Sequence, residues 1–418
     1  MANVWIEKAL AEINHCNKCG FCLPACPTYR LTGNEVDSPR GRIALVEGVL
    51  KDEISADDGL VASLSYCLGC RACETACPSG VQYHRVLEAG KKVLDQTKPG
   101  HRQLTWVPRT LLRLTHQPRR LRRVARWGKR ATRWPLPSHL KMLAPMLDYR
   151  AEPVAAPPPA LTSPSEPVLF FHGCVQEALF HDANQAAKAL LTAAGYRVQQ
   201  RPEETCCGAL AWHAGREEEA RTLARRNIEA FERDEGPIVN TAGGCGAMLK
   251  SYPELFEEDP AWRERAERFS ERVSDWLSLM ENSPRPLAFQ GAGERVVLQN
   301  SCHLVNVEGG GQRPAEMLSR VVGDTFLPLE GQDRCCGSAG IYNIQHPDWA
   351  LKLLDRKMEE VKGARPVRVL VVNPGCQLQM TLGVRRHQVD AEVEHLARYL
   401  YRAFLRAQRQ PESGHEAG

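Results

Sequence analysis

The hydrophobic residues of this chain follow different patterns in its two halves. Within residues 1–98, stretches such as VWIEKALAEI and RGRIALVEGVL repeat their apolar residues at helical spacing. From residue 168 onward, short apolar runs such as VLFF and VRVLVV alternate with longer amphipathic stretches such as AAKALLTAA. Short strands that alternate with helices are typical of α/β units. The pattern therefore predicts an α+β multidomain protein, with a mainly helical N-terminal domain followed by α/β structure.

The α/β part contains an internal repeat marked by cysteines. Each copy has one cysteine, then a Cys-Cys-Gly doublet, then one further cysteine. These are Cys174, Cys206, Cys207 and Cys245 in the first copy, and Cys302, Cys335, Cys336 and Cys376 in the second. Corresponding cysteines are 128 to 131 residues apart, so the spacing between the cysteines is almost the same in the two copies. We interpret this as a duplicated α/β domain.

Eight further cysteines lie near the N-terminus in two runs of identical spacing. Both runs read C-x₂-C-x₂-C-x₃-C-P, the bacterial ferredoxin spacing, in which the fourth cysteine of one run binds the cluster of the other run. The spacing predicts two [4Fe–4S] clusters with interleaved ligands. Cluster 1 is assigned to Cys16, Cys19, Cys22 and Cys77, and cluster 2 to Cys67, Cys70, Cys73 and Cys26.

A pair of structural zinc sites is the alternative for these eight cysteines. Zinc sites usually combine two distant C-x₂-C pairs, whereas each run here places four cysteines within eleven residues, which favours iron–sulfur clusters. Two neighbouring clusters form an electron conduit, so no catalytic residue is assigned. Lys18 and Arg71 lie between ligands, where they either raise a reduction potential or are simply solvated.

Together with the doublet, the single cysteines before and after it give each repeat four sulfur atoms from three loops. We expect these loops to meet at one edge of an α/β sheet, where such folds place their sites. Two readings remain open. The cysteines hold one or two further iron–sulfur clusters, with zinc less favoured, or they are inert buried core residues. His172 and His303 flank these cysteines and are interpreted as hydrogen-bonded structural residues. His84 is placed near cluster 2.

Composition places the domain boundaries. Residues 99–167 are first basic and then proline-rich, which favours a stiff connector. The predicted organisation is a two-cluster ferredoxin-type domain at 1–98, the connector at 99–167, a first α/β repeat at 168–290 and a second at 291–418. In the first domain, Ser38 and Pro39 predict a helix start. Arg40 and Arg42 follow, and they alternatively face a cluster or an acidic partner.

The connector concentrates the positive charge of the chain. Residues 91–150 contain 16 Lys and Arg and two acidic residues, whereas the net charge of the whole chain is only +4. Within the basic segment 109–133, Leu121, Val124 and Ala125 form a narrow apolar stripe. Three interpretations fit: a helix lying on anionic lipid, a solvated linker helix, or a contact for an acidic partner. Nucleic-acid binding is disfavoured because no nucleic-acid-binding motif accompanies the charge.

Sixteen cysteines without a secretory signal predict a cytoplasmic protein, because disulfides rarely persist in that compartment. No apolar run is long enough to cross a membrane, so any membrane association would be peripheral. No GxGxxG or Walker motif follows a strand, and the glycine run 309–311 lacks both contexts. We therefore expect no flavin on this chain.

Several motifs together resemble a known family. The stretches CPTYRLTGNEVDSPRGRI, CLGCRACETACPSGVQYH, ETCCGA, NTAGGCGAM, DRCCGSAGIY and NPGCQ are similar to those of the iron–sulfur subunit of bacterial glycolate oxidase (glycolate dehydrogenase). The resemblance runs from about Cys16 to Gln377 and is weakest in the connector. Looser similarity extends to electron-transfer subunits of anaerobic glycerol-3-phosphate dehydrogenase, lactate utilisation and heterodisulfide reductase. The repeats correspond to the CCG domains of these proteins.

The resemblance implies a partner scheme. FAD-containing subunits would oxidise glycolate to glyoxylate, and this chain would pass the electrons to a quinone-type acceptor at the cytoplasmic face of the membrane. The alternative is a related system, including thiol or disulfide chemistry at the doublets as in heterodisulfide reductase. Against this, heterodisulfide reductases close with C-x-x-C, whereas Met248 stands three residues after Cys245, and Cys376 is followed by Gln377 and Leu378 with no cysteine next to them. Asn306 likewise replaces a histidine that is common in relatives.

Overall fold

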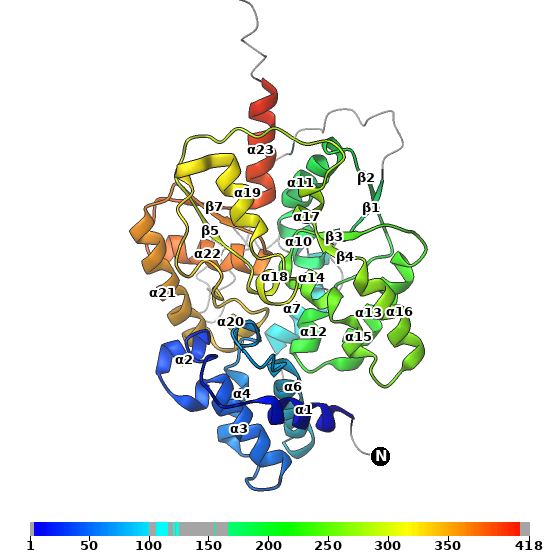
Figure 1. Ribbon diagram of the computed structural model, residues 1–418, viewed down its shortest axis with the longest axis vertical. Helices are drawn as coiled ribbons and strands as arrows, with labels where there is room; N and C mark the ends of the chain where they lie inside the picture. The colour runs from blue at the N-terminus through cyan, green and yellow to red at the C-terminus, as the bar shows by residue number, and fades with distance from the viewer. Residues whose placement is uncertain are drawn as a thin grey trace, which may run out of the picture. The chain divides into compact units, whose positions relative to one another are not determined.

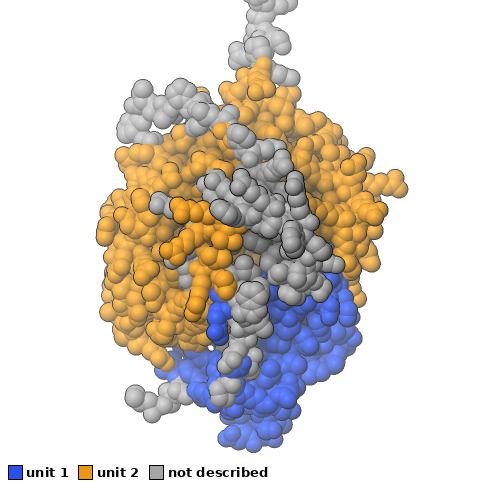
Figure 2. All heavy atoms as spheres, turned by 180° about the vertical axis from the view of Figure 1, so that it is seen from behind, with its two compact units in different colours: residues 1–109, 334–354 blue, residues 110–333, 355–418 orange. Residues whose placement is uncertain are grey.

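The computed structural model describes residues 4–98, 106–115 and 166–409, together with Gly100, Arg120, Leu121, Arg123, Val124 and Val154. Two compact units are distinguished (Figure 2). Unit 1 contains residues 1–109 and 334–354, and unit 2 contains residues 110–333 and 355–418. The segment that carries the second cysteine doublet therefore belongs to the same unit as the N-terminal domain, although it is more than 200 residues away along the chain.

Unit 1 is helical, as the sequence predicts (Figure 1). Helix α6 (Tyr83–Thr97) contacts α1 (Val4–His15), α3 (Pro39–Leu50) and α4 (Asp58–Ser65). Their facing apolar residues form a core of almost fully buried side chains that includes Val46, Leu64, Val86 and Leu94. The remaining elements are α2 (Pro27–Thr32), the 3₁₀ turn η1 (Glu35–Asp37), α5 (Ala72–Thr75) and α20 (Tyr342–Gln345).

Aromatic contacts join segment 334–354 to the N-terminal domain within unit 1. The ring of Tyr66 stacks on that of Trp349, with centroids 4.3 Å apart, and meets His346 edge-on. The hydroxyl of Tyr342 donates to the carbonyl oxygen of Tyr66 over 3.3 Å. Because Tyr66 directly precedes Cys67, these contacts bring the second doublet segment next to the second cysteine run.

Helix α3 begins as the sequence predicts. The hydroxyl of Ser38 accepts a hydrogen bond from the amide of Gly41 over 2.9 Å, and Pro39 occupies the first helical position. This N-cap confirms the predicted helix start. The cap also explains the glycine. A Cβ atom added at Gly41 would lie 1.9 Å from the carbonyl oxygen of Glu35, so only glycine fits against the preceding turn.

We expect Gly41→Ala to lower the free energy of unfolding by about 1–3 kcal/mol, because the added methyl group forces the turn at Glu35 away from the helix. Thermal and urea unfolding of the cluster-loaded protein measure the change. Gly363→Ala is the control, since its Cβ would meet no atom within 4 Å. That change should be neutral or stabilising by up to about 1 kcal/mol. Equal effects of both substitutions would contradict the packing argument.

Unit 2 contains two parallel sheets (Figure 1). The first has the order β2-β1-β3-β4, with β1 at Pro167–Phe170, β2 at Arg197–Gln200, β3 at Ile238–Asn240 and β4 at Val273–Asp275. The second has the order β5-β6-β7, with β5 at Val296–Gln299, β6 at Arg368–Val371 and β7 at Glu392–His395. All neighbouring strands are parallel, as expected for α/β repeats.

Helices connect these strands. In the first repeat they are α10 (Cys174–Leu179), α11 (His181–Ala193), α12 (Ala209–His213), α13 (Glu217–Phe231), α14 (Gly243–Lys250), α15 (Tyr252–Leu255), α16 (Pro260–Glu271) and α17 (Trp276–Glu281). In the second they are α18 (Cys302–Asn306), α19 (Arg313–Val322), the 3₁₀ turn η3 (Gly323–Thr325), α21 (Pro347–Ala364), α22 (Pro374–Arg386) and α23 (Leu396–Arg409). Helix α7 (Trp106–Thr115) precedes both repeats.

The duplication is visible in the strand register. Strand β1 begins its pairing with β2 at Pro167 and Arg197, and a single parallel bridge joins Val296 to Phe326 in the second repeat. Each member of the second pair lies 129 residues after its counterpart in the first. The second repeat thus keeps the position of β2 as one bridge instead of a strand.

The two repeats share one hydrophobic core. Helix α11 of the first repeat packs on α23 of the second (Figure 1). Leu190 from α11 and Tyr399 from α23 are fully buried in a cluster that also contains strand residues Phe170 and Leu370. Because burial of apolar surface is the main stabilising contribution, each repeat depends on the other for part of its stability.

A buried histidine also links the repeats. The Nε2 atom of His395, at the end of β7, lies 2.9 Å from the carbonyl oxygen of Thr241, which follows β3. The Nδ1 atom accepts from the amide of Ala397 over 3.1 Å, so the proton resides on Nε2. Burial lowers the pKa of His395 from 6.5 to about 4.

This histidine should make stability depend on pH. Between pH 6.5 and about 4 the unfolded chain binds a proton at His395 that the folded chain does not, so stability falls as the pH falls. From pH 7 to pH 5 the loss from this residue is about 2 kcal/mol. Urea unfolding at both pH values should show a smaller loss in His395→Gln than in the unsubstituted chain. Equal losses would contradict the assigned neutral histidine.

Candidate iron–sulfur sites

Each N-terminal cysteine run makes the same unusual backbone turn. The residues before and after the second cysteine both have positive φ: 52° at Lys18 and 87° at Gly20 in the first run, and 62° at Gly69 and 58° at Arg71 in the second. The left-handed conformation costs a non-glycine residue about 1–2 kcal/mol, so Lys18 and Arg71 are strained. Both runs contain a strained residue at this turn, which indicates that the turn is required to bring the cysteines of each run together.

The four cysteines assigned to cluster 1 meet at one cavity. Cys16, Cys19, Cys22 and Cys77 all line it, and Cys73 of the second set lines it as well. Pro39, Ile43 and Val81 provide an apolar wall. Burial raises the pKa of Cys22 to about 11, and the neighbouring Cys16 and Cys26 thiols also raise it. Such a thiol stays protonated at neutral pH unless a cation displaces the proton. This donor set fits a metal-centred group.

The cysteines assigned to cluster 2 also lie together. The pKa of Cys73 is raised well above its usual value by burial and by the nearby Cys70, Cys67 and Cys26 thiols. Cys26, from the first run, thus affects Cys73 of the second run, and it also raises the pKa of Cys22 in its own run. The hydroxyl of Tyr83 donates to the sulfur of Cys67 over 3.7 Å. All eight cysteines are free thiols rather than disulfides, so the chemistry of both sets fits the predicted clusters.

Within the described part of the chain, no three Cys, His, Asp or Glu side chains are close enough to bind a single metal ion. A cubane cluster makes a different demand. Each of its thiolates binds a different iron atom, so the four sulfur atoms surround a cluster instead of one ion. Four thiolates arranged around a cubane therefore need not form such a single-ion group.

Charged residues between the ligands have carboxylate partners. Lys18 is largely exposed and lies 3.5 Å from Glu47, whereas Arg71 is mostly buried and pairs with Glu74 over 2.8 Å. Glu74 also accepts from the backbone amide of His84 and lies 2.9 Å from its Nδ1 atom. His84 is therefore close to the second run, as expected, and contacts a residue that lies between Cys73 and Cys77.

The first doublet gathers its four cysteines at the carboxyl ends of β1, β2 and β3. Cys174 begins α10, the doublet Cys206–Cys207 precedes α12, and Cys245 lies in α14. The sulfur atoms of Cys174 and Cys206 are 3.3 Å apart. The pKa of Cys207 is raised by hydrogen-bond contacts with the Cys206 and Cys245 thiols and by burial. The three loops thus converge at the edge of the sheet that the sequence predicts.

Two buried residues that no sequence motif indicated hold this doublet in place. Asn227 donates to the carbonyl oxygen of Cys206 over 3.1 Å and to the hydroxyl of Tyr252 over 2.9 Å, and its own oxygen accepts from the amide of Thr205. Tyr252 donates to the carbonyl oxygen of Cys207 over 3.0 Å. Asn227 and Tyr252 are fully buried. The only available signal was the position of Tyr252, two helical turns after Cys245.

The second set is divided between the two compact units. Cys335 and Cys336 belong to unit 1, whereas Cys302 and Cys376 belong to unit 2. The local turn repeats that of the first doublet, since φ is 90° at Gly337 and 91° at Gly208. The amide of Gly337 donates to the sulfur of Cys335 over 3.4 Å.

The flanking histidines differ in their surroundings. His172 lies 3.0 Å from a carboxylate oxygen of Glu204 through Nδ1 and 2.9 Å from Gln200 through Nε2, which fits the predicted structural role. The Nδ1 atom of His303 is 3.9 Å from the sulfur of Cys302. Asn306, which replaces the common histidine, ends helix α18.

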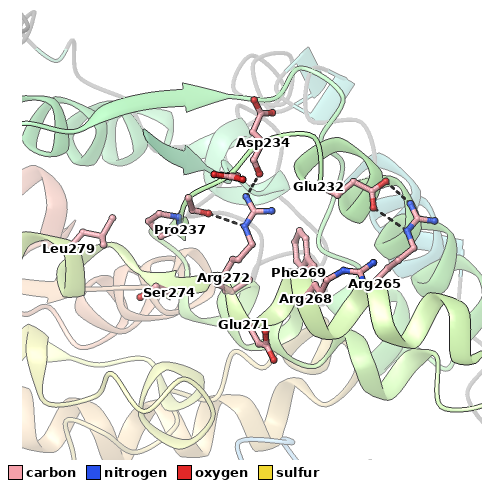
Figure 3. Close-up of a pocket in the computed structure, with 13 residues that line it drawn as sticks. Glu232, Asp234, Pro237, Arg265, Arg268, Phe269, Glu271, Arg272, Ser274 and Leu279 are labelled. Atoms are coloured by element: carbon pink, nitrogen blue, oxygen red, sulfur yellow. Dashed lines mark hydrogen bonds and ion pairs between the residues drawn. The ribbon is translucent and has the colours of Figure 1, made fainter. Parts of the chain in front are cut away.

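A hollow at the opposite end of the first sheet contains no cysteine. It lies where β3 and β4 begin, and Arg272 and Arg265 line it (Figure 3). The guanidinium of Arg272 donates to the carbonyl oxygens of Gly236 and Asp234, and Arg265 pairs with Glu232 (Figure 3). Arg272 also donates to the carbonyl oxygen of Phe231. These arginines stabilise the surrounding loops.

Most of the basic segment 109–133 lies outside the described residues. Of its predicted apolar stripe, Leu121 is buried against Leu179 and Phe180, and Val124 is 48% exposed. Leu121 therefore contributes to the protein core and Val124 does not, while Ala125 of the predicted stripe lies outside the described residues. In the described part of the chain, no helix is both long and apolar enough to cross a bilayer.

Comparison with known proteins identifies these parts. A family model described as a 4Fe-4S dicluster domain matches residues 12–81, and one described as a cysteine-rich domain matches residues 168–250 and 296–381. The probable glycolate oxidase iron-sulfur subunit of Bacillus subtilis (strain 168) is 37% identical over 420 residues, covering 94% of each chain. This chain belongs to the glycolate oxidase iron–sulfur subunit family. The Escherichia coli (strain K12) glycolate oxidase iron-sulfur subunit is 33% identical over 384 residues, covering 90% of this chain and 92% of that protein.

A second group of relatives covers a smaller part of this family member. Lactate utilization protein A of Exiguobacterium sp. (strain ATCC BAA-1283 / AT1b) is 30% identical over 240 residues, which are 56% of this chain and 96% of that protein. Together the comparisons confirm the predicted family, the α+β architecture with two cysteine-rich repeats, and iron–sulfur clusters as the cofactor class. The dicluster match decides against zinc at the N-terminal runs.

Proposed function

We propose that this chain is the electron-transferring subunit of a flavin-dependent oxidoreductase complex that oxidises glycolate to glyoxylate. The observation that carries the proposal is the pair of cysteine runs with identical ferredoxin spacing, inside a region that matches a 4Fe-4S dicluster domain. We propose that their ligands interleave, so that Cys77 joins the first set and Cys26 joins the second. Cubane clusters, when bound, accept and release single electrons. The chain itself would contribute ligands and an apolar surrounding, and glycolate oxidation itself is proposed to take place on a flavoprotein partner.

The relatives named as glycolate oxidase subunits support glycolate as the substrate. The relatives named for lactate utilisation make lactate, another 2-hydroxy acid, the second candidate substrate. The ligand sets that we propose are Cys16, Cys19, Cys22 and Cys77 for cluster 1, and Cys67, Cys70, Cys73 and Cys26 for cluster 2. The doublet cysteines are proposed as additional iron–sulfur ligands. A quinone is the proposed acceptor, with peripheral membrane contact through the basic segment.

The test is co-purification of this chain with its flavoprotein partner under anaerobic conditions. Adding glycolate should bleach the flavin and produce the electron paramagnetic resonance (EPR) signal of reduced [4Fe–4S] clusters, and a soluble quinone should then remove that signal. Reduction by L-lactate or glycerol-3-phosphate, but not by glycolate, would reassign the substrate. A chain that holds fewer than about eight irons after full reconstitution would overturn the electron-transfer role itself.

A further inference from the structure

The helix that follows the first cysteine run carries a buried arginine without a carboxylate partner. Arg42, in α3, is 1% exposed. Its Nε atom donates to the carbonyl oxygen of Ser63 over 2.8 Å, and both terminal nitrogens donate to the hydroxyl oxygen of Thr28 over 3.2 Å. In the described part of the chain, no carboxylate lies within ion-pair distance of Arg42. A buried charge without a counter-charge is strongly destabilising.

The groups around Arg42 identify the missing counter-charge. The Thr28 hydroxyl oxygen is 3.2 Å from the sulfur of Cys26, and its proton is donated to the carbonyl oxygen of Asp37 over 2.6 Å. Thr28 therefore accepts from Arg42 and has no second proton for the sulfur. Burial alone would lower the pKa of Arg42, but nearby Tyr83, Cys67, Cys26 and, last in size, Asp37 raise it when they are negative. Asp37 makes no ion pair with Arg42, and Cys67 and Cys26 are proposed cluster 2 ligands.

The proton inventory of Arg42 leads to the same conclusion. Each terminal nitrogen carries two N–H bonds and uses one of them on Thr28, so two N–H bonds remain without an oxygen acceptor. Thiolate and sulfide sulfur atoms of a bound cluster are acceptors of the required negative charge. A cubane with four thiolate ligands is an anion, and its negative charge increases when it takes up an electron.

We propose that Arg42 is the built-in counter-charge of cluster 2, which it stabilises most in the reduced state, so that cluster 2 has a higher reduction potential than it would have without this arginine. The proposal rests on the ligand sets given under the proposed function. Arg42 would thus bias an electron that enters the chain toward the cluster bound by Cys26, Cys67, Cys70 and Cys73.

Arg40 provides a matched comparison on the same helix. It lies two residues earlier and lines the cavity of cluster 1, but its side chain is 32% exposed. It pairs with Glu35 and donates to the carbonyl oxygen of Lys18 over 3.0 Å. The charge of Arg40 is thus already balanced by a carboxylate and screened by water, so its effect on a cluster should be small.

The test is an EPR-monitored redox titration of the reconstituted, full-length chain with dithionite as the reductant. The transition that disappears in Cys26→Ser protein is assigned to cluster 2. In Arg42→Gln, the ratio of reduced to oxidised cluster 2 at a fixed potential should fall about tenfold, which is about 59 mV for one electron. Arg40→Gln should leave this transition unchanged, and Arg42→Lys, which keeps the charge, should restore most of it.

The outcomes separate this inference from the proposed function. Unshifted transitions in Arg42→Gln with a full complement of iron would overturn the counter-charge and leave the electron-transfer role intact. If Arg42→Gln loses cluster 2, the lysine variant decides. Iron retained in Arg42→Lys supports a charge requirement. Loss of iron in both variants would overturn the counter-charge, because the shape of the guanidinium and not its charge would then be what the cluster needs. An unsubstituted chain that fails to bind about eight irons would instead overturn the proposed function.

Discussion

Cys26→Ser is expected to lower the iron content of the reconstituted chain from about eight atoms to about four. In the proposed interleaved arrangement, Cys26 belongs to the first run but binds cluster 2. It raises the pKa of Cys73, and it does not line the cavity that contains the cluster 1 set and Cys73. Serine is a poor replacement because iron–sulfur clusters prefer thiolate ligands. The substitution should therefore abolish cluster 2 and spare cluster 1. Iron analysis and EPR spectroscopy of dithionite-reduced protein measure the effect.

Cys22→Ser is the matched control within the same run. It should abolish cluster 1, and its EPR spectrum should resemble that of Cys77→Ser, a variant 55 residues away along the chain. Cys26→Ser should in turn resemble Cys70→Ser. If Cys26→Ser and Cys22→Ser remove the same EPR signal, each run binds its own cluster and the interleaved assignment is wrong.

Asn227→Ala is expected to lower the free energy of unfolding by about 3 kcal/mol, because truncation leaves several buried polar groups without partners. The amide of Thr205, the carbonyl oxygen of Cys206 and the hydroxyl of Tyr252 would all lose the hydrogen bonds that Asn227 makes with them. Urea unfolding of the full chain measures the effect. The same substitution should also reduce metal uptake beyond the eight irons of the N-terminal clusters, since the doublet loop loses its support.

Thr222→Ala is the control on the same helix, α13. The Thr222 side chain is exposed and bonds only to the backbone of its own helix, so its removal should change stability by no more than about 0.5 kcal/mol. Tyr252→Phe should give an intermediate loss, because it removes the hydroxyl that joins Asn227 to Cys207 and keeps the buried ring. A loss in Asn227→Ala no larger than in Thr222→Ala would contradict the supporting role.

The features that could be predicted from the sequence are encoded by residues that lie close together along the chain. The ferredoxin spacing of the two runs indicated iron–sulfur clusters, and the dicluster match confirms that cofactor. Ser38 and Pro39 predicted the start of α3 because a helix cap involves only neighbouring residues. The duplication was readable from the even spacing of the doublets, and both repeats form parallel sheets.

Only the tertiary structure decided which distant residues surround these elements. It places segment 334–354 in unit 1, through the contacts of Tyr66 with Trp349 and Tyr342. It also buries Arg42 against Thr28, whose hydroxyl contacts the sulfur of Cys26, and Asn227 beneath the first doublet. No local pattern marks such positions, because an arginine or asparagine has the same backbone preferences whether it is buried or solvated. Its role is set by desolvation and by partners that folding brings from elsewhere in the chain.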